Sequence, residues 1–246
     1  MNTARVSAAG RTTPSKAKND RLLRAKATRV DGILTRVYGR KKVDKRRADP
    51  LDTLMLTILS QNTNDVNRDR AYRSLKTAYP KWQDLMASTS SKVAKVIRVG
   101  GLANIKSRRL IDVLRFIHRE RGGLSLDFLG GMSREEAEAW LSRMKGVGPK
   151  TRAIVLLFSL GMPAFPVDTH VHRVTKRLGL IGRRTSREQA QVELAKLVPE
   201  NEYYNFHINL IEHGRAICVA RKPKCAVCPI RSLCDYYRDV FLKGQT

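Results

Sequence analysis

The four cysteines of the chain lie close together, at Cys218, Cys225, Cys228 and Cys234, in the pattern Cys-x6-Cys-x2-Cys-x5-Cys. So compact a set of thiols predicts a metal centre, and both zinc and an iron–sulfur cluster accept four thiolates. Zinc sites more often contain two short Cys-x2-Cys pairs or histidines, so the single pair here favours the cluster. Disulfides are the less favoured alternative, because the chain shows no apolar signal-peptide core and we expect a reducing compartment.

A lysine beside a glycine-rich turn is the second candidate for chemistry. Lys150 follows Pro149, a residue suited to the first position of a helix, in the stretch "MKGVGPKTR". The positive end of the helix macrodipole and burial would both lower the pKa of an ammonium group there. A neutral lysine amine is a nucleophile that can form a Schiff base with a sugar carbon. The alternative is a surface lysine paired with a phosphate.

Asp168 is the third candidate, at the start of "PVDTHVHRV". It precedes an amphipathic helical pattern and is suited to cap that helix. The same carboxylate could orient or deprotonate Lys150, or stabilise positive charge that develops on a sugar ring. Sequence spacing alone does not place the two side chains together. His170 and His172 follow, but the histidines of the chain show no metal-ligand spacing.

The composition predicts a folded protein with a polyanionic partner. The chain has 246 residues, 42% of them hydrophobic, and a formal net charge of +26. Such a charge favours nucleic acid first and an anionic membrane surface second. The longest apolar run, residues 153–165, is too short to span a bilayer, so we expect no membrane segment.

Helical patterns dominate and alternating strand patterns are scarce, so the predicted fold is all-α. Asp49 and Pro50 predict the start of one helix, whose apolar face ends before the polar stretch "SQNTND". Ser133 and Glu136 form a capping box before another helix. Further helical patterns cover the ranges 66–78, 91–98 and 104–120, and the range 133–160 is predicted as helix, hairpin, helix.

The hairpin is predicted to bind an anion. Gly146 and Gly148 let the backbone approach a ligand, and the N–H groups that begin the second helix form an anion site. Lys145 adds positive charge beside it. A DNA phosphate is the expected guest, and a simple tight turn is the alternative. The loop between the first two cysteines carries Arg221, Lys222 and Lys224, which also suit a DNA backbone.

Residues 1–28 are predicted to be a disordered basic tail, because they lack helical periodicity and large apolar side chains. Three roles stay open for this tail: an organellar leader, an arm that adds nonspecific DNA affinity, or a solubilising segment. A cytoplasmic, nucleoid-associated protein is expected, with organellar targeting left open.

The two quoted motifs and the cysteine pattern together resemble the endonuclease III branch of the helix-hairpin-helix DNA glycosylases, over roughly residues 30–236. The resemblance implies a four-iron four-sulfur cluster on the four cysteines and two α-helical domains. One would be a six-helix barrel over residues 50–162, and the other would combine residues 29–49 with 163–246 around the cluster. Double-stranded DNA would lie in the cleft between them, bound by a monomer.

By the same resemblance, Lys150 matches the catalytic lysine and Asp168 the catalytic aspartate. The implied activity is that of a bifunctional DNA glycosylase and AP lyase, which removes oxidised pyrimidines through a Schiff base and β-elimination. Mismatched or deaminated bases and pyrimidine dimers are alternative substrates, and a noncatalytic DNA-binding module is the alternative from another class.

Three further residues are implied at the place where the base leaves the duplex. Either Gln61 or Asn62 would fill the gap left by the flipped nucleotide, since the motif "LSQNTND" departs here from the usual Ala-Gln. Leu102, in the turn "GGLA", would help to part the bases; an ordinary hydrophobic turn residue is the alternative.

Overall fold

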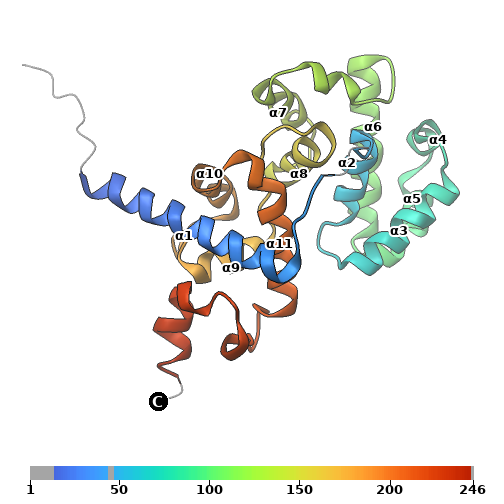
Figure 1. Cartoon of the computed structure of the whole chain (residues 1–246). Coiled ribbons are helices and arrows are strands. Elements are labelled where there is room, and N and C mark those ends of the chain that lie inside the picture. The colour runs from blue at the N-terminus through green and yellow to red at the C-terminus, as the bar shows by residue number, and fades with distance from the viewer. Residues whose placement is uncertain (1–13, 44–46, 245–246) are drawn as a thin grey trace, which may run out of the picture.

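The computed structural model describes residues 14–43 and 47–244, and these ranges contain eleven α-helices and no β-strand (Figure 1). The predicted all-α fold is confirmed. Within the described ranges, no helix is both long and apolar enough to cross a membrane.

The first of two hydrophobic cores lies among seven helices of the barrel segment. These helices are α2 (Pro50–Leu59), α3 (Asp65–Ala78), α4 (Trp82–Ala87), α5 (Ser90–Val96), α6 (Ala103–Arg121), α7 (Arg134–Ser142) and α8 (Pro149–Ile154). The short helix α4 is not among the predicted elements. It buries Trp82 and Leu85, and the Trp82 indole donates to Asp52 Oδ1 at 2.9 Å.

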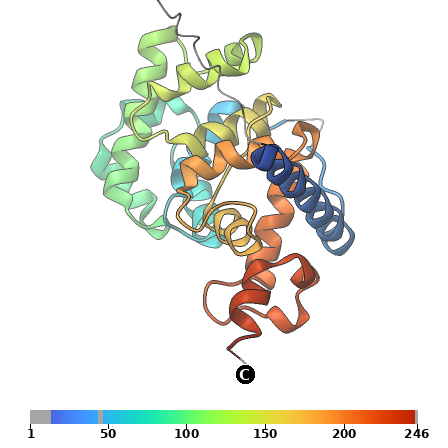
Figure 2. The same cartoon turned by 90° about the vertical axis from the view of Figure 1, so that its left-hand side faces the viewer.

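The second core joins the N-terminal helix to the C-terminal part of the chain. Its helices are α1 (Pro14–Tyr38), α9 (Thr169–Leu178), α10 (Arg187–Leu197) and α11 (Tyr203–Ala216). In Figures 1 and 2, α1 lies along α11, and the segment after α11 forms a lobe away from the barrel helices. The two cores alternate along the chain where they meet, because Leu157 packs in the second core and Ala164 in the first.

Local signals explain how the helices around the site begin. The Asp49 side chain caps α2 by accepting from the backbone N–H of Asp52 at 2.8 Å, as predicted. Ser133 and Glu136 form the predicted capping box at the start of α7. After α8 the chain continues as a π-helical segment, Val155–Leu160, which the helical pattern did not distinguish from an α-helix.

The prediction of a disordered tail is wrong for residues 14–28, which belong to α1. Leu23, Ala27, Val30 and Leu34 follow one another at helical spacing and pack in the second core. Lys26 Nζ also donates to the carbonyl of Leu178 and, at 2.9 Å, to Asp235 Oδ1. Packing against distant residues therefore orders a segment that has few large apolar side chains. Residues 1–13 lie outside the described part of the chain.

Candidate active site and cysteine cavity

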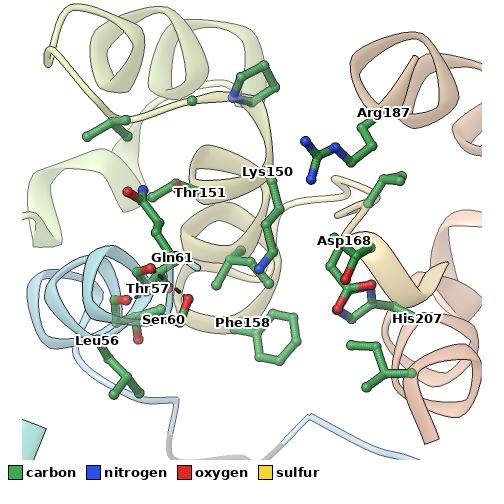
Figure 3. Close-up of a pocket in the computed structure, with 18 of the residues that line it drawn as sticks. Leu56, Thr57, Ser60, Gln61, Lys150, Thr151, Phe158, Asp168, Arg187 and His207 are labelled. Atoms are coloured by element: carbon green, nitrogen blue, oxygen red, sulfur yellow. Dashed lines mark hydrogen bonds between the residues drawn. The ribbon is translucent and has the colours of Figure 1, made fainter. Parts of the chain in front are cut away.

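An open cleft of about 1270 Å³ lies between the two cores and contains both predicted catalytic side chains. Lys150 comes from the first turn of α8, and Asp168 stands directly before α9. Figure 3 shows both side chains directed into this cleft from opposite walls. The fold therefore brings together Lys150 and Asp168, which sequence spacing alone does not place near each other.

The surroundings of Lys150 favour its neutral form. Burial lowers the pKa of its ammonium group, while the carboxylates of Asp168 and Asp65 act in the opposite direction and offset part of this effect. Neutral amine is therefore more abundant than on an exposed lysine. The geometry thus supplies the reactive form of the side chain that a Schiff base requires.

Asp168 has the capping role that its position predicted. Its Oδ1 accepts from the backbone N–H of Val171 at 2.8 Å, which fixes the carboxylate at the start of α9. Figure 3 shows the carboxylate beside His207 and on the side of the cleft that faces Lys150. One side chain therefore both caps a helix and places negative charge in the cleft.

His207 on α11 is a cleft residue that the sequence did not single out. Its ring is buried, and Nδ1 lies 2.9 Å from the carbonyl of Pro166. Burial lowers the pKa of this imidazole, so it is neutral, and Nδ1 donates to the carbonyl. No spacing rule connects residue 207 to residues 150 and 168, and only the packing of α11 against α9 brings it here.

Gln61 and Asn62, the two candidates for filling the flipped-base gap, differ in their surroundings. Arg109 donates to Gln61 Oε1, and Gln61 Nε2 donates to the carbonyl of Gly146 at 3.5 Å. Gln61 is thus held against the hairpin. Asn62 is exposed and has a φ of 52°, in the left-handed region. Gln61 thus has side-chain hydrogen bonds to the hairpin side of the cleft, whereas Asn62 lies on the surface.

A buried lysine holds the two loops that face the expected DNA. Lys106 Nζ donates to the carbonyl of Leu59 at 2.7 Å and to that of Gly100 at 2.8 Å. Leu59 ends α2, just before Gln61, and Gly100 precedes Leu102, which is 50% exposed with a φ of 48°. Lys106 could have been found from the sequence, because it falls on the apolar face of the 104–120 pattern.

The remaining residues predicted to contact DNA lie in two regions of the structure, the cleft and the cysteine loop. Lys145, Gly146 and Gly148 line the cleft, and a side chain added at Gly148 would meet open space, so this backbone is accessible. Arg221, Lys222 and Lys224 are exposed on the cysteine loop and are not among the residues that line the cleft.

The four cysteines surround a single small cavity at the far end of the second core. The rest of its wall contains apolar side chains, among them Leu178 and Ile230, and polar ones, among them Arg177 and His213. Within the described ranges, no three His, Cys, Asp or Glu side chains are arranged to hold one metal ion. Thiols spread around a cavity suit a cluster of several metal atoms better than a single zinc ion, so the residues fit the predicted group.

Arg177 on α9 braces this cavity. Its guanidinium donates to Cys218 Sγ at 3.3 Å and to the carbonyls of Val219 and Ala220 at 2.8 and 3.0 Å. A cation beside the thiols offsets the negative charge of thiolate ligands, and hydrogen bonds to sulfur tune a cluster. Residues 218–220 are thereby joined to α9, the helix that Asp168 caps.

Comparison with known proteins matches two family models to this chain. Residues 55–200 match the HhH-GPD superfamily of base excision DNA repair proteins, which is more than half of the chain. Residues 218–234 match the iron–sulfur binding domain of endonuclease III, and this segment begins and ends at Cys218 and Cys234. The chain therefore carries a four-iron four-sulfur cluster.

Individual relatives agree with these models. The chain is 39% identical to a putative DNA glycosylase of Arabidopsis thaliana, over 75% of this chain and 66% of the plant protein. It is 32% identical to endonuclease III of Thermotoga maritima, over 85% of this chain and 93% of the bacterial one. A solved covalent endonuclease III–DNA intermediate superposes with a TM-score of 0.75 at 26% identity, covering 92% of this chain and 99% of that one.

One family assignment accounts for the fold, the shared cleft of Lys150 and Asp168, the cysteine cavity and these matches. The chain belongs to the endonuclease III family of the HhH-GPD superfamily, the DNA glycosylase/lyases of base excision repair.

Proposed function

We propose that this glycosylase/lyase removes damaged pyrimidines from double-stranded DNA with Lys150 as the nucleophile. The observation that carries the proposal is the shared cleft, in which a lysine with a lowered pKa faces the fixed carboxylate of Asp168. A damaged base must leave the duplex to reach such a cleft, and base flipping supplies that step.

The chemistry follows from these two groups. Neutral Lys150 Nζ bonds to C1′ of the deoxyribose, and the electron pair of the N-glycosidic bond leaves with the base, which is then protonated. Asp168 stabilises the positive charge that develops on the sugar. After ring opening gives the Schiff base, loss of a proton from C2′ breaks the C3′–oxygen bond and cuts the strand on its 3′ side. Hydrolysis then returns Lys150 to its free amine.

Positive charge and loop geometry support the DNA-binding side of the proposal. The accessible hairpin backbone at Gly148 and the exposed Lys145 would hold the phosphates around the lesion. Asn62 would fill the gap, and Leu102 would separate the neighbouring bases. The cluster, held by the four cysteines, would stiffen the loop of Arg221, Lys222 and Lys224 against the DNA backbone.

Cysteine chemistry supports a proposal for the compartment in which the protein acts. Thiolate ligands persist in a reducing compartment, so the proposed location is the cytoplasm, as in the sequence analysis. The proposed state is a monomer bound to DNA.

Borohydride trapping tests the nucleophile. The wild-type protein, incubated with a duplex that contains an abasic site and then reduced, should form a covalent adduct, and Lys150→Ala should form none. Lys92→Ala, which removes an exposed lysine of α5 remote from the cleft, is the matched control and should form the adduct normally. An adduct that persists in Lys150→Ala would assign the nucleophile to another residue.

A further inference from the structure

A buried histidine near the end of α11 contacts the cysteine cavity, and the proposed chemistry assigns it no role. His213 lines the cavity and is 1% exposed. Its Nε2 lies 3.5 Å from Cys228 Sγ, a length suited to a hydrogen bond with the large sulfur atom. The backbone carbonyl of His213 also accepts from the backbone N–H of Cys218 at 2.9 Å. One residue of α11 therefore contacts two of the cysteines, one through its main chain and one through its side chain.

Tyr38, the last residue of α1, lies on the other side of this imidazole ring. Its hydroxyl is 3.1 Å from His213 Nδ1, and the two rings meet edge to face at 68°, with their centroids 6.1 Å apart. The two residues are 175 positions apart in the chain and meet because α1 lies along α11 (Figures 1 and 2). Both nitrogen atoms of the buried ring therefore have a defined partner.

The chemistry of the cysteine ligand fixes the direction of both hydrogen bonds. A cysteine that binds iron does so as a thiolate, which has no proton to donate. His213 Nε2 must therefore carry a proton and donate to Cys228 Sγ. Burial favours the neutral ring, so Nδ1 keeps a lone pair and accepts from the Tyr38 hydroxyl. The opposite tautomer would turn the lone pair of Nε2 toward a negatively charged sulfur.

We propose that Tyr38 and His213 form a chain of two hydrogen bonds that protects the iron–sulfur cluster from oxidation. Donation by His213 Nε2–H draws electron density from the Cys228 thiolate, and hydrogen bonds to the sulfur ligands help to set the reduction potential of a cluster. Such a bond stabilises the more reduced and more negative form, so a stronger oxidant is needed to remove an electron. The Tyr38 hydroxyl holds the imidazole in the tautomer and orientation that donate. Both are positioning residues that act through Cys228.

Two substitutions of His213 that differ in their ability to donate test the proposal on the holoprotein. Glutamine can place an amide N–H near the position of Nε2, whereas leucine fills similar space and has no donor. In His213→Leu, the reduction potential measured by protein-film voltammetry should fall. Ferricyanide should also bleach the visible absorption of this variant about 10-fold faster, the usual effect of one hydrogen bond to a charged group.

The glutamine variant distinguishes donation from packing. His213→Gln should keep the reduction potential and the bleaching rate close to those of the wild type. Equal values in the leucine and glutamine variants, or loss of the cluster from both, would show that His213 only fills space and would overturn the proposal.

A milder substitution tests the contribution of Tyr38. Tyr38→Phe removes only the hydroxyl, so it should lower the potential and speed bleaching less than His213→Leu, because Nε2 still donates from a less firmly held ring. Tyr79→Phe is the matched control, since it removes a hydroxyl that pairs with Ser88 in the barrel, and it should change neither value. Wild-type values in Tyr38→Phe would overturn the role of Tyr38.

The tautomer can be measured without changing His213 itself. Nitrogen NMR of the holoprotein, labelled at its histidine rings, should show one ring with a protonated Nε2 and an unprotonated Nδ1 whose signal shifts in Tyr38→Phe. This measurement holds even if the His213 variants do not fold. A proton on Nδ1 of the ring that responds to Tyr38→Phe would overturn the proposal.

Discussion

The catalytic cleft and the cysteine cavity are assembled in opposite ways. The cleft draws its side chains from α2, α8, α9 and α11, so residues as distant as Gln61 and His207 meet in it. The cavity takes all four of its thiols from residues 218–234 and depends on one distant cation, Arg177. A site built from distant elements depends on the packing of whole helices, whereas a site in one segment depends mainly on its own ligands.

This difference predicts how each region responds to substitution. The cleft should lose chemistry while the fold is retained, because its groups are partly exposed and stand on helices held by two separate cores. The cysteine loop should lose stability first, because cluster binding by its four thiols is coupled to its folding.

Among the substitutions that compare the catalytic cleft with the cysteine cavity, Asp168→Asn is expected to slow turnover most. Asparagine caps a helix about as well as aspartate, so the melting temperature should change little. Loss of the negative charge should slow base release roughly 100- to 1,000-fold, the usual cost of one preorganised electrostatic group. Single-turnover kinetics and thermal melting measure the two quantities, with Asp127→Asn, an exposed carboxylate remote from the cleft, as the control. A variant that melts early but reacts at the normal rate would reverse the expectation.

Cys225→Ser should show the opposite pattern. Loss of a cluster ligand should remove the visible absorption and destabilise the chain by about 4 kcal/mol, which at this length lowers the melting temperature by roughly 10 °C. Ser232→Ala, an exposed position in the same segment, should do neither. The fraction that stays folded should still form the Lys150 adduct. If that fraction forms none, the two regions are coupled more strongly than their separate construction indicates.

The pH dependence of trapping sharpens the account of the cleft. Burial lowers the pKa of Lys150 from 10.5, so the adduct rate should rise with pH and the midpoint of this rise should lie below that value. Asp168 raises the pKa of Lys150, and Asp168→Asn should therefore move the rising limb to lower pH. A limb that moves to higher pH would show that the carboxylate acts on Lys150 in another way.

Removal of N-terminal residues should have the smallest effect on DNA binding and stability. It tests which residues of α1 stabilise the second core. Deleting residues 1–13 removes Arg5 and Arg11, so the slope of log affinity against log salt should change by at most about 2. Deleting residues 1–28 also removes Lys26 and Ala27, whose packing and hydrogen bonds join α1 to the C-terminal part. That longer deletion should lower the melting temperature as well. Equal melting temperatures for both deletions would show that α1 contributes nothing before residue 29.

Local signals in the sequence determined most of the secondary structure and the identity of the reactive groups. Asp49, Ser133 and Pro149 begin the helices that they predict, because caps and first-turn prolines act on their own neighbours. The four cysteines are recognisable for the same reason, since all of them lie in one segment. Lys150 and Asp168 could be proposed as reactive groups from their positions at helix starts.

Only the tertiary structure decided which side chains meet. The packing of separate helices decides that residues 14–28 are helical and that Arg109 contacts Gln61. It also decides the loop contacts of Lys106 and the position of His207 in the cleft. Hydrogen bonds within a helix link residues three or four positions apart, and their signals are therefore local. Contacts between helices arise from burial of apolar faces, which is nondirectional, so the sequence shows that a face is buried without showing what lies against it.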